Sequence, residues 1–124
     1  MNPIRKAMFT AAALCMLVAG SVATAAPASA VGNCPYGYVC VYDYQQFGGD
    51  KIVSGSINRC FRLYEFKFEG YVESYVNYMS VDAHLWTFDT GTGWDKTRTL
   101  VSGKFSSAIP PNYAEAVCTG NAKP

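Results

Sequence analysis

The stretch that decides the fold is Tyr42-Asp43-Tyr44-Gln45-Gln46-Phe47-Gly48-Gly49, which combines two spaced aromatic residues with a pair of glycines. Its spacing is an aromatic residue, four residues, a second aromatic residue, one residue and a glycine. The glycine pair predicts a turn over residues 45–50, because glycine adopts positive φ angles without steric cost. Residues 38–42 before the turn are rich in Tyr and Val and favour a strand, and residues 51–53 begin another. The stretch therefore predicts two strands joined by a tight turn.

Further strands are expected along the chain beyond this turn. Residues 63–69 alternate in character, with Tyr64, Phe66 and Phe68 on one face and charged residues on the other, which predicts a strand with one solvated face. The remaining expected elements are strands at 79–88 and 97–101, a glycine-rich loop at 90–96 and a proline-containing surface loop at 109–112. Strands at this spacing favour an all-β sandwich of Greek keys. Because no low-complexity linker follows residue 33, residues 31–124 are expected to form one domain.

Residues 1–30 are predicted to be a signal peptide that is removed on export. Arg5 and Lys6 form a short positive region, an apolar segment follows, and Ala28-Ser29-Ala30 fits the small-residue rule for cleavage. The apolar segment is too short to span a bilayer. Val31 is therefore the expected first residue of a secreted, extracellular protein that is not associated with a membrane after processing.

Four cysteines remain after export, because Cys15 lies within the predicted signal peptide. An even number of cysteines in an exported chain indicates a disulfide framework, for which three pairings are possible. We favour a short loop between the first two cysteines, since a proline and a glycine between them let the chain turn back. The predicted disulfides are then Cys34–Cys40 and Cys60–Cys118.

Composition argues against several classes of function. Lys and Arg number 10 and Asp and Glu 9, and two of the basic residues lie in the predicted signal peptide, so residues 31–124 present no basic field that would attract nucleic acid. His84 is the single histidine, and it alternates with apolar neighbours as in an ordinary strand. A zinc site would need further histidines or closely spaced cysteine pairs. We therefore expect no catalytic residue, no metal and no cofactor.

The aromatic and glycine spacing over residues 42–49 resembles the folded-hairpin signature of the βγ-crystallin family. Together with Cys34-Pro35-Tyr36-Gly37-Tyr38-Val39-Cys40, it is similar to the small secreted actinobacterial proteins classed as metalloproteinase inhibitors. The resemblance is close over residues 34–77 and weaker over residues 78–124. It implies a βγ-crystallin-like Greek-key sandwich, in which the aromatic residues pack beneath the hairpin and the glycine adopts a conformation closed to other residues.

Many βγ-crystallins bind Ca²⁺, and the resemblance locates two degraded versions of their binding motif in this chain. The first is Glu69-Gly70-Tyr71-Val72-Glu73-Ser74 followed by Asn77, in which Gly70 has no side-chain oxygen and Glu73 replaces a hydroxyl residue. The second is Ser102-Gly103-Lys104-Phe105-Ser106-Ser107, which has no carboxylate. Ca²⁺ takes roughly six to eight oxygen ligands with negative charge among them, so we expect little binding of Ca²⁺.

The resemblance also implies a partner, an extracellular protease of the zinc metalloproteinase class, which the protein would bind as a monomer. The candidate contact segment is the loop at 90–96, where Trp94 stands between Gly93 and Asp95. Large aromatic residues are common binding anchors. Inhibitors of the resembled type close their contact segment with a disulfide, and no cysteine pair could close this one. Ile109-Pro110-Pro111 is therefore a second candidate, because its prolines make it stiff.

Two other classes of function stay open at this point. A cell-wall, glycan-binding or toxin-like module would use exposed Tyr and Trp residues to stack on sugar rings or on a target surface. An enzyme would need a polar cleft that holds His84 beside a carboxylate. A coplanar row of exposed aromatic residues would favour the first class, and one protruding loop on a rigid base would favour inhibition.

Overall fold

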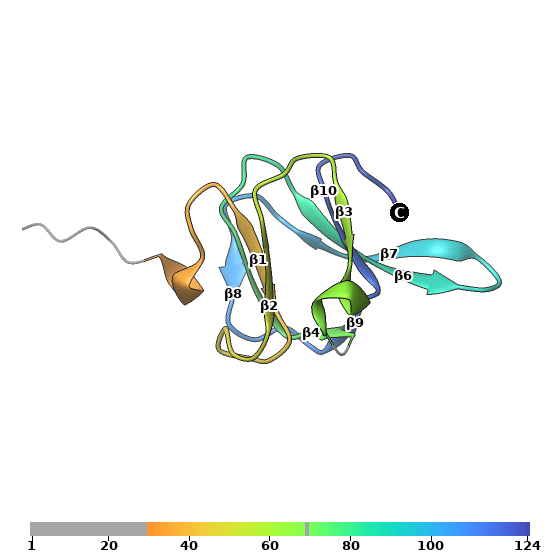
Figure 1. Cartoon of the computed structure of the whole chain (residues 1–124), viewed down its shortest axis with the longest axis horizontal. Helices are drawn as coiled ribbons and strands as arrows, with labels where there is room; N and C mark the ends of the chain where they lie inside the picture. Colours follow the sequence, from red (N-terminus) through yellow and green to blue (C-terminus); the bar gives the residue numbers. More distant parts are fainter. Residues whose placement is uncertain (1–29, 69) are drawn as a thin grey trace, which may run out of the picture.

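Two four-stranded antiparallel sheets form the body of the protein in a computed structural model, which describes residues 30–68 and 70–124 (Figure 1). The first sheet has the order β2-β1-β5-β8, with β1 Val39–Tyr42, β2 Lys51–Ser54, β5 Ser74–Asn77 and β8 Phe105–Ser106. The second has the order β3-β10-β6-β7, with β3 Cys60–Arg62, β6 Ala83–Asp89, β7 Gly93–Leu100 and β10 Ala116–Thr119. A small pair joins β4 Tyr71–Val72 to β9 Asn112–Tyr113. The prediction of an all-β fold is confirmed, whereas the crystallin-like Greek key stays a prediction.

The predicted turn between β1 and β2 is confirmed. Gly49 has a φ of 76°, in the region that favours glycine. The rings of Tyr42 and Phe47 pack edge to face with their centroids 5.5 Å apart. The hydroxyl of Ser74 on β5 donates a hydrogen bond to the Tyr44 carbonyl (2.6 Å) and accepts one from the Phe47 amide (3.1 Å). The turn is therefore held against β5 by side-chain hydrogen bonds.

The main hydrophobic core lies between the two sheets. Alternate residues of the strands face it, because successive side chains of a strand point to opposite faces. Its members come from both sheets and from the connections between them, namely Val39, Val41, Ile52, Leu63, Phe68, Val72, Met79, Ala83, Leu85, Leu100, Ile109, Ala114 and Val117. A second cluster, of Trp86, Ala116 and Cys118 with Cys60, Trp94 and Ala122, lies on the opposite face of the second sheet.

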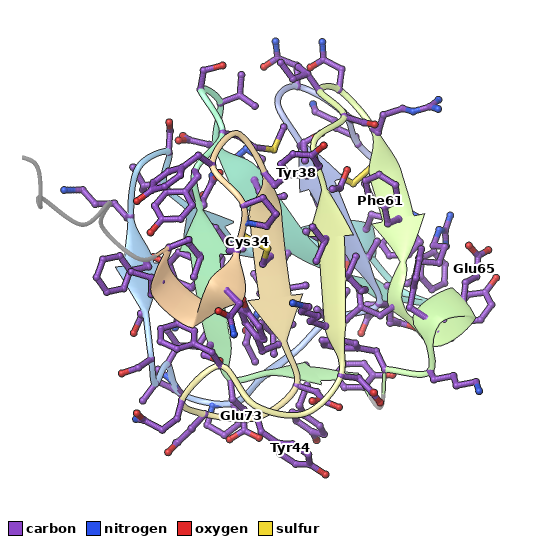
Figure 2. All side chains as sticks on the ribbon, turned by 60° about the vertical axis from the view of Figure 1, so that its left-hand side comes forward. Cys34, Tyr38, Tyr44, Phe61, Glu65 and Glu73 are labelled. Atoms are coloured by element: carbon purple, nitrogen blue, oxygen red, sulfur yellow. A yellow bond between two sulfur atoms is a disulfide. The ribbon has the colours of Figure 1, made fainter. Side chains whose placement is uncertain are left out.

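Both predicted disulfides are present. Cys34–Cys40 closes a short loop before β1, and Figure 2 shows Cys34 beside that strand. Cys60–Cys118 joins β3 to β10, where the two residues are direct partners in the antiparallel register. The first disulfide therefore holds the N-terminal segment on the first sheet, and the second links two neighbouring strands of the second sheet.

The predicted strand at 63–69 is wrong. Residues Leu63–Phe66 form a short 3-10 helix, η2, and Lys67 follows it in the left-handed conformation with a φ of 63°. Leu63 and Phe68 are buried, but Tyr64 and Glu65 point outward (Figure 2). Leu63 and Phe68 both reach the core, one on each side of an exposed turn. The alternating pattern of the sequence did not reveal this arrangement. Glu69 lies outside the described residues.

Two other expected elements are shorter or longer than predicted. The strand expected at 79–88 begins only at residue 83, because residues 79–82 form a bend. The loop expected at 90–96 is limited to residues 90–92, since β7 begins at Gly93 rather than near residue 97. In the part of the chain that the structure describes, no helix is long and apolar enough to cross a membrane. The predicted signal peptide falls almost wholly on residues 1–29, which lie outside the described residues.

Candidate functional site

The hairpin formed by β6 and β7 extends away from the body of the molecule (Figure 1). The two strands pair in antiparallel fashion along most of their length, with a β-bulge where Leu85 and Trp86 meet Arg98 and Lys96. The turn at residues 90–92 is exposed to solvent. A segment that protrudes in this way can reach into the cleft of another protein.

Hydrogen bonds order the tip of this hairpin. The Asp89 Oδ1 atom accepts from the amides of Gly91 (2.6 Å) and Thr92 (3.3 Å). The Thr92 hydroxyl in turn donates to Asp95 Oδ2 at 2.6 Å. An Asp side chain that bonds to amides two and three residues later stabilises a turn. The tip therefore has a defined shape although no disulfide closes it.

Trp94 lies on strand β7, not on a loop as predicted. It pairs with Phe88 across the hairpin, and the two rings pack edge to face with their centroids 5.4 Å apart. The Arg62 guanidinium lies 4.5 Å from the centroid of the Trp94 ring, at a distance typical of a cation–π contact. Trp94 is half-buried, Phe88 is 49% exposed, and Asp95 is exposed. The side chain predicted as an anchor is therefore packed against two neighbouring side chains, and its role in binding stays a prediction.

A notch of about 320 Å³ opens beside the outer part of the hairpin, between Arg62, Phe88, Trp94 and Glu115. The Glu115 carboxylate accepts a hydrogen bond from the Phe88 amide at 2.6 Å. β10 begins at residue 116, where Ala116 pairs with Trp86 of β6. Glu115 therefore bonds to β6 just outside the region in which the two strands pair. The outer part of β6 is thereby tied to the residue that precedes β10.

Sequence reasoning missed Arg62 and Glu115. The two residues come from segments on either side of the hairpin in the sequence, and 27 positions separate Glu115 from its partner Phe88. A hydrogen bond over that distance leaves no local pattern in the chain. Such residues can be found only from the strand order, which places β10 beside β6 and β3 on the far side of β10.

The second candidate segment, Ile109-Pro110-Pro111, is less suited to contact a partner. Ile109 is buried in the main core, and its amide donates to the Glu73 carbonyl at 2.9 Å. The two prolines are exposed, but the large apolar residue of the segment is already packed. The hairpin is therefore the better candidate.

The residues that fitted the calcium motif have structural roles. The hydroxyl of Ser74 is bonded to the β1–β2 turn, and the side chain of Asn77 is fully buried with all its polar atoms in hydrogen bonds. In the second motif, the Ser102 hydroxyl donates to the Met79 carbonyl and the Ser106 hydroxyl to the Ala108 carbonyl. Among the described residues, no three His, Cys, Asp or Glu side chains are grouped so that they could hold a metal.

His84 lies on the face of β6 opposite the main core. Its Nδ1 atom is 3.1 Å from the Thr99 hydroxyl. Burial, and then the nearby positive charge of Lys96, lower the pKa of His84 below its ordinary value, which favours the neutral ring near pH 7. The Asp82 carboxylate that shares a hollow with it accepts from the Ser102 amide. Within residues 30–68 and 70–124, His84 makes no hydrogen bond to a carboxylate.

Aromatic residues on the surface pack in inclined pairs. The pairs Tyr36–Tyr78, Phe61–Phe66, Tyr71–Tyr113 and Phe88–Trp94 have interplanar angles between 37° and 71°. A row of coplanar rings, which would favour stacking on a glycan, is not formed by these pairs. One protruding hairpin on a fixed base is instead the arrangement that favours inhibition.

Comparison with protein-family models identifies a family. The family model described as peptidase inhibitor family I36 matches residues 27–96, more than half of the 124-residue chain. The matched range ends inside β7, two residues after Trp94, and so includes the turn of the hairpin. No curated protein and no solved structure matches the chain.

Proposed function

This chain belongs to peptidase inhibitor family I36, a family of non-enzymatic inhibitors, and from that premise we propose that it is a secreted inhibitor of an extracellular zinc metalloproteinase. The hairpin of β6 and β7 enters the active-site cleft of the peptidase, with Trp94, Gly93 and Asp95 among the contacting residues. The protein acts as a monomer and has the βγ-crystallin-like fold implied by its sequence.

The observation that carries this proposal is the ordered, protruding hairpin with an aromatic pair next to its turn. A rigid segment loses little conformational entropy on binding, so more of its contact energy appears as affinity. Hydrogen bonds to the Asp89 carboxylate and from the Thr92 hydroxyl order the tip, and the Glu115 carboxylate holds the Phe88 amide. Phe88 and Trp94 supply apolar surface next to the exposed turn, and buried aromatic residues frequently dominate binding energy at interfaces.

Replacing Trp94 with alanine is expected to weaken inhibition about 30-fold, equivalent to about 2 kcal/mol, because a large aromatic contact is removed. The measurement is a titration of a thermolysin-like metalloproteinase and of a serine protease with the purified protein. Phe105→Ala is the control, since Phe105 is an exposed aromatic residue on β8 in the other sheet, and its replacement should leave inhibition unchanged. Far-ultraviolet circular dichroism should show that both variants are folded.

Two results would contradict this proposal. If micromolar protein inhibits no metalloproteinase, the metalloproteinase assignment is wrong. If Trp94→Ala inhibits as well as the unchanged protein, inhibition uses a different surface and the hairpin must be discarded.

Secretion predicts a defined N-terminus at Val31. The structure supports this position, because the Val31 amide donates to the Tyr78 hydroxyl (3.0 Å) and the Tyr42 hydroxyl donates to the Gly32 carbonyl (2.7 Å). Residues 31 and 32 are therefore already hydrogen-bonded to the body of the protein. Intact mass spectrometry of protein from the culture medium is expected to give a chain that begins at Val31, within one or two residues. An extracellular product that retains Met1 would exclude the signal peptide.

A further inference from the structure

A hollow of about 370 Å³ lies beside the base of the hairpin, where the segment after β10 turns back over the second sheet (Figure 1). It lies on the face of the sheet opposite the main core. Its lining comes from β6, β7 and the C-terminal segment, namely His84, Trp86, Lys96, Gly120, Asn121, Ala122 and Lys123. A volume of this size lies at the lower end of the range for small-molecule sites and fits a ligand of about one sugar or amino-acid residue.

The charged side chains that line this hollow are all positive. Lys96 and Lys123 contribute two ammonium groups, and the lining includes no aspartate or glutamate. The Lys96 Nζ atom is 5.8 Å from the centroid of the Trp86 ring. Asp82 faces the neighbouring hollow, where its carboxylate is already bonded to the Ser102 amide. The lining therefore attracts an anion.

The hydrogen-bond donors available to a ligand are side-chain groups. The amides of Gly120 and Ala122 donate to the carbonyls of Asp82 and Thr119, and the Asn121 amide donates to the Asn58 side chain. Phosphate is commonly held by a series of free main-chain amides, which this segment does not provide. The Trp86 indole N–H has no hydrogen-bond partner among the described residues either, but it is buried, so the accessible donors are those of the lysines and Asn121.

We propose that this hollow binds a small carboxylate ligand, of the size of one sugar acid or one acylated amino acid. Lys96 and Lys123 neutralise the carboxylate, and the aromatic ring of Trp86 forms part of the floor. Asn121 adds an amide that can bond to a polar group of the ligand. The site lies on the same sheet as the hairpin, but it uses none of the residues assigned above to the peptidase contact.

Trp86 provides a direct reporter for this site. The chain has two tryptophans, so a Trp94→Phe variant keeps Trp86 as its single tryptophan. Titration of this variant with glucuronate and with N-acetylglycine is expected to give a saturable change in fluorescence, with a Kd of about 1 mM. The neutral counterparts, glucose and N-acetylglycinamide, should bind at least about tenfold more weakly if the charge is recognised. The Trp86 indole N–H signal in a ¹⁵N–¹H spectrum should move in the same titrations.

A pair of lysine variants separates this site from general attraction of anions. In the same background, Lys96→Met removes the ammonium but keeps an apolar chain, and it should weaken carboxylate binding at least about tenfold. Lys104→Met removes an exposed lysine outside the hollow and should change nothing. Equal binding of the neutral compounds, or no effect of Lys96→Met, would overturn the proposal. Tighter binding of inorganic phosphate than of glucuronate would overturn the carboxylate assignment, and none of these outcomes bears on inhibition of a peptidase.

Discussion

Replacement of Asn77 with alanine is expected to lower the free energy of unfolding by at least about 3 kcal/mol, because three main-chain groups lose their partner. The Asn77 amide nitrogen donates to the carbonyls of Val81 (3.0 Å) and Leu100 (2.8 Å), and its oxygen accepts from the Met79 amide (2.9 Å). The residue has no exposed surface. Each buried group left without a partner costs roughly 1–3 kcal/mol. Asn77 therefore connects β5 to the bend before β6 and to the end of β7.

A denaturant titration of the variant measures this loss. Asn112→Ala is the matched control, since that amide makes an exposed hydrogen bond to the Thr97 hydroxyl and should contribute less than about 1 kcal/mol. Asn77→Asp keeps the acceptor for Met79 but loses both donors and buries a carboxylate, so it should not restore stability. A loss below about 1 kcal/mol for Asn77→Ala would show that solvent replaces these bonds.

Replacement of Gly49 with alanine is expected to lower the free energy of unfolding by about 3 kcal/mol. The positive φ of Gly49 is itself unfavourable for a residue with a side chain. An added Cβ would also overlap Oδ1 of Asp43 and the ring of Tyr44, so these two side chains must shift. That shift would disturb the bonds that Ser74 makes to the turn. Steric overlap at a special backbone conformation is among the mechanisms that give large losses.

Gly48→Ala tests whether the loss of stability is specific to position 49 or follows from replacing any glycine of this turn. A Cβ on Gly48 would lie 3.3 Å from the Gln45 carbonyl oxygen and 3.8 Å from the Tyr44 Cβ, contacts that require at most a small adjustment. Thermal and denaturant unfolding of both variants should show a much larger loss for Gly49→Ala. Equal losses of stability in the two variants would show that the conformation of Gly49 is not the cause.

The features that could be predicted from sequence are those with local causes. The β1–β2 turn follows from two adjacent glycines, and the short disulfide loop follows from residues between its own cysteines. Once Cys34 and Cys40 are paired, the Cys60–Cys118 disulfide follows by elimination. The conformational freedom of glycine and the length of a loop affect only a few neighbouring residues, so both can be recognised in the sequence.

The features that could not be predicted depend on contacts between distant segments. Residues 63–66 form a 3-10 helix because Leu63 and Phe68 both reach the core, which requires knowledge of what lies beneath them. Trp94 is on a strand because β7 pairs with β6 as far as Gly93, and glycines around residues 91 and 93 had indicated a longer loop. Arg62 and Glu115 contact Trp94 and Phe88 of the candidate site. These contacts could not be predicted without the strand order of the second sheet.

The disulfide between β3 and β10 has a consequence for the fate of the hairpin. Residues 60–118 form a covalent ring closed by Cys60 and Cys118, and the exposed turn at 90–92 lies within it. A peptidase that hydrolyses one bond in this turn opens the ring without producing two molecules. The new ends belong to β6 and β7, which lie in one sheet beside β10, the strand that carries Cys118. The cleaved protein therefore remains one molecule that can still bind the peptidase. Release of a fragment requires reduction of the disulfide as well as proteolysis.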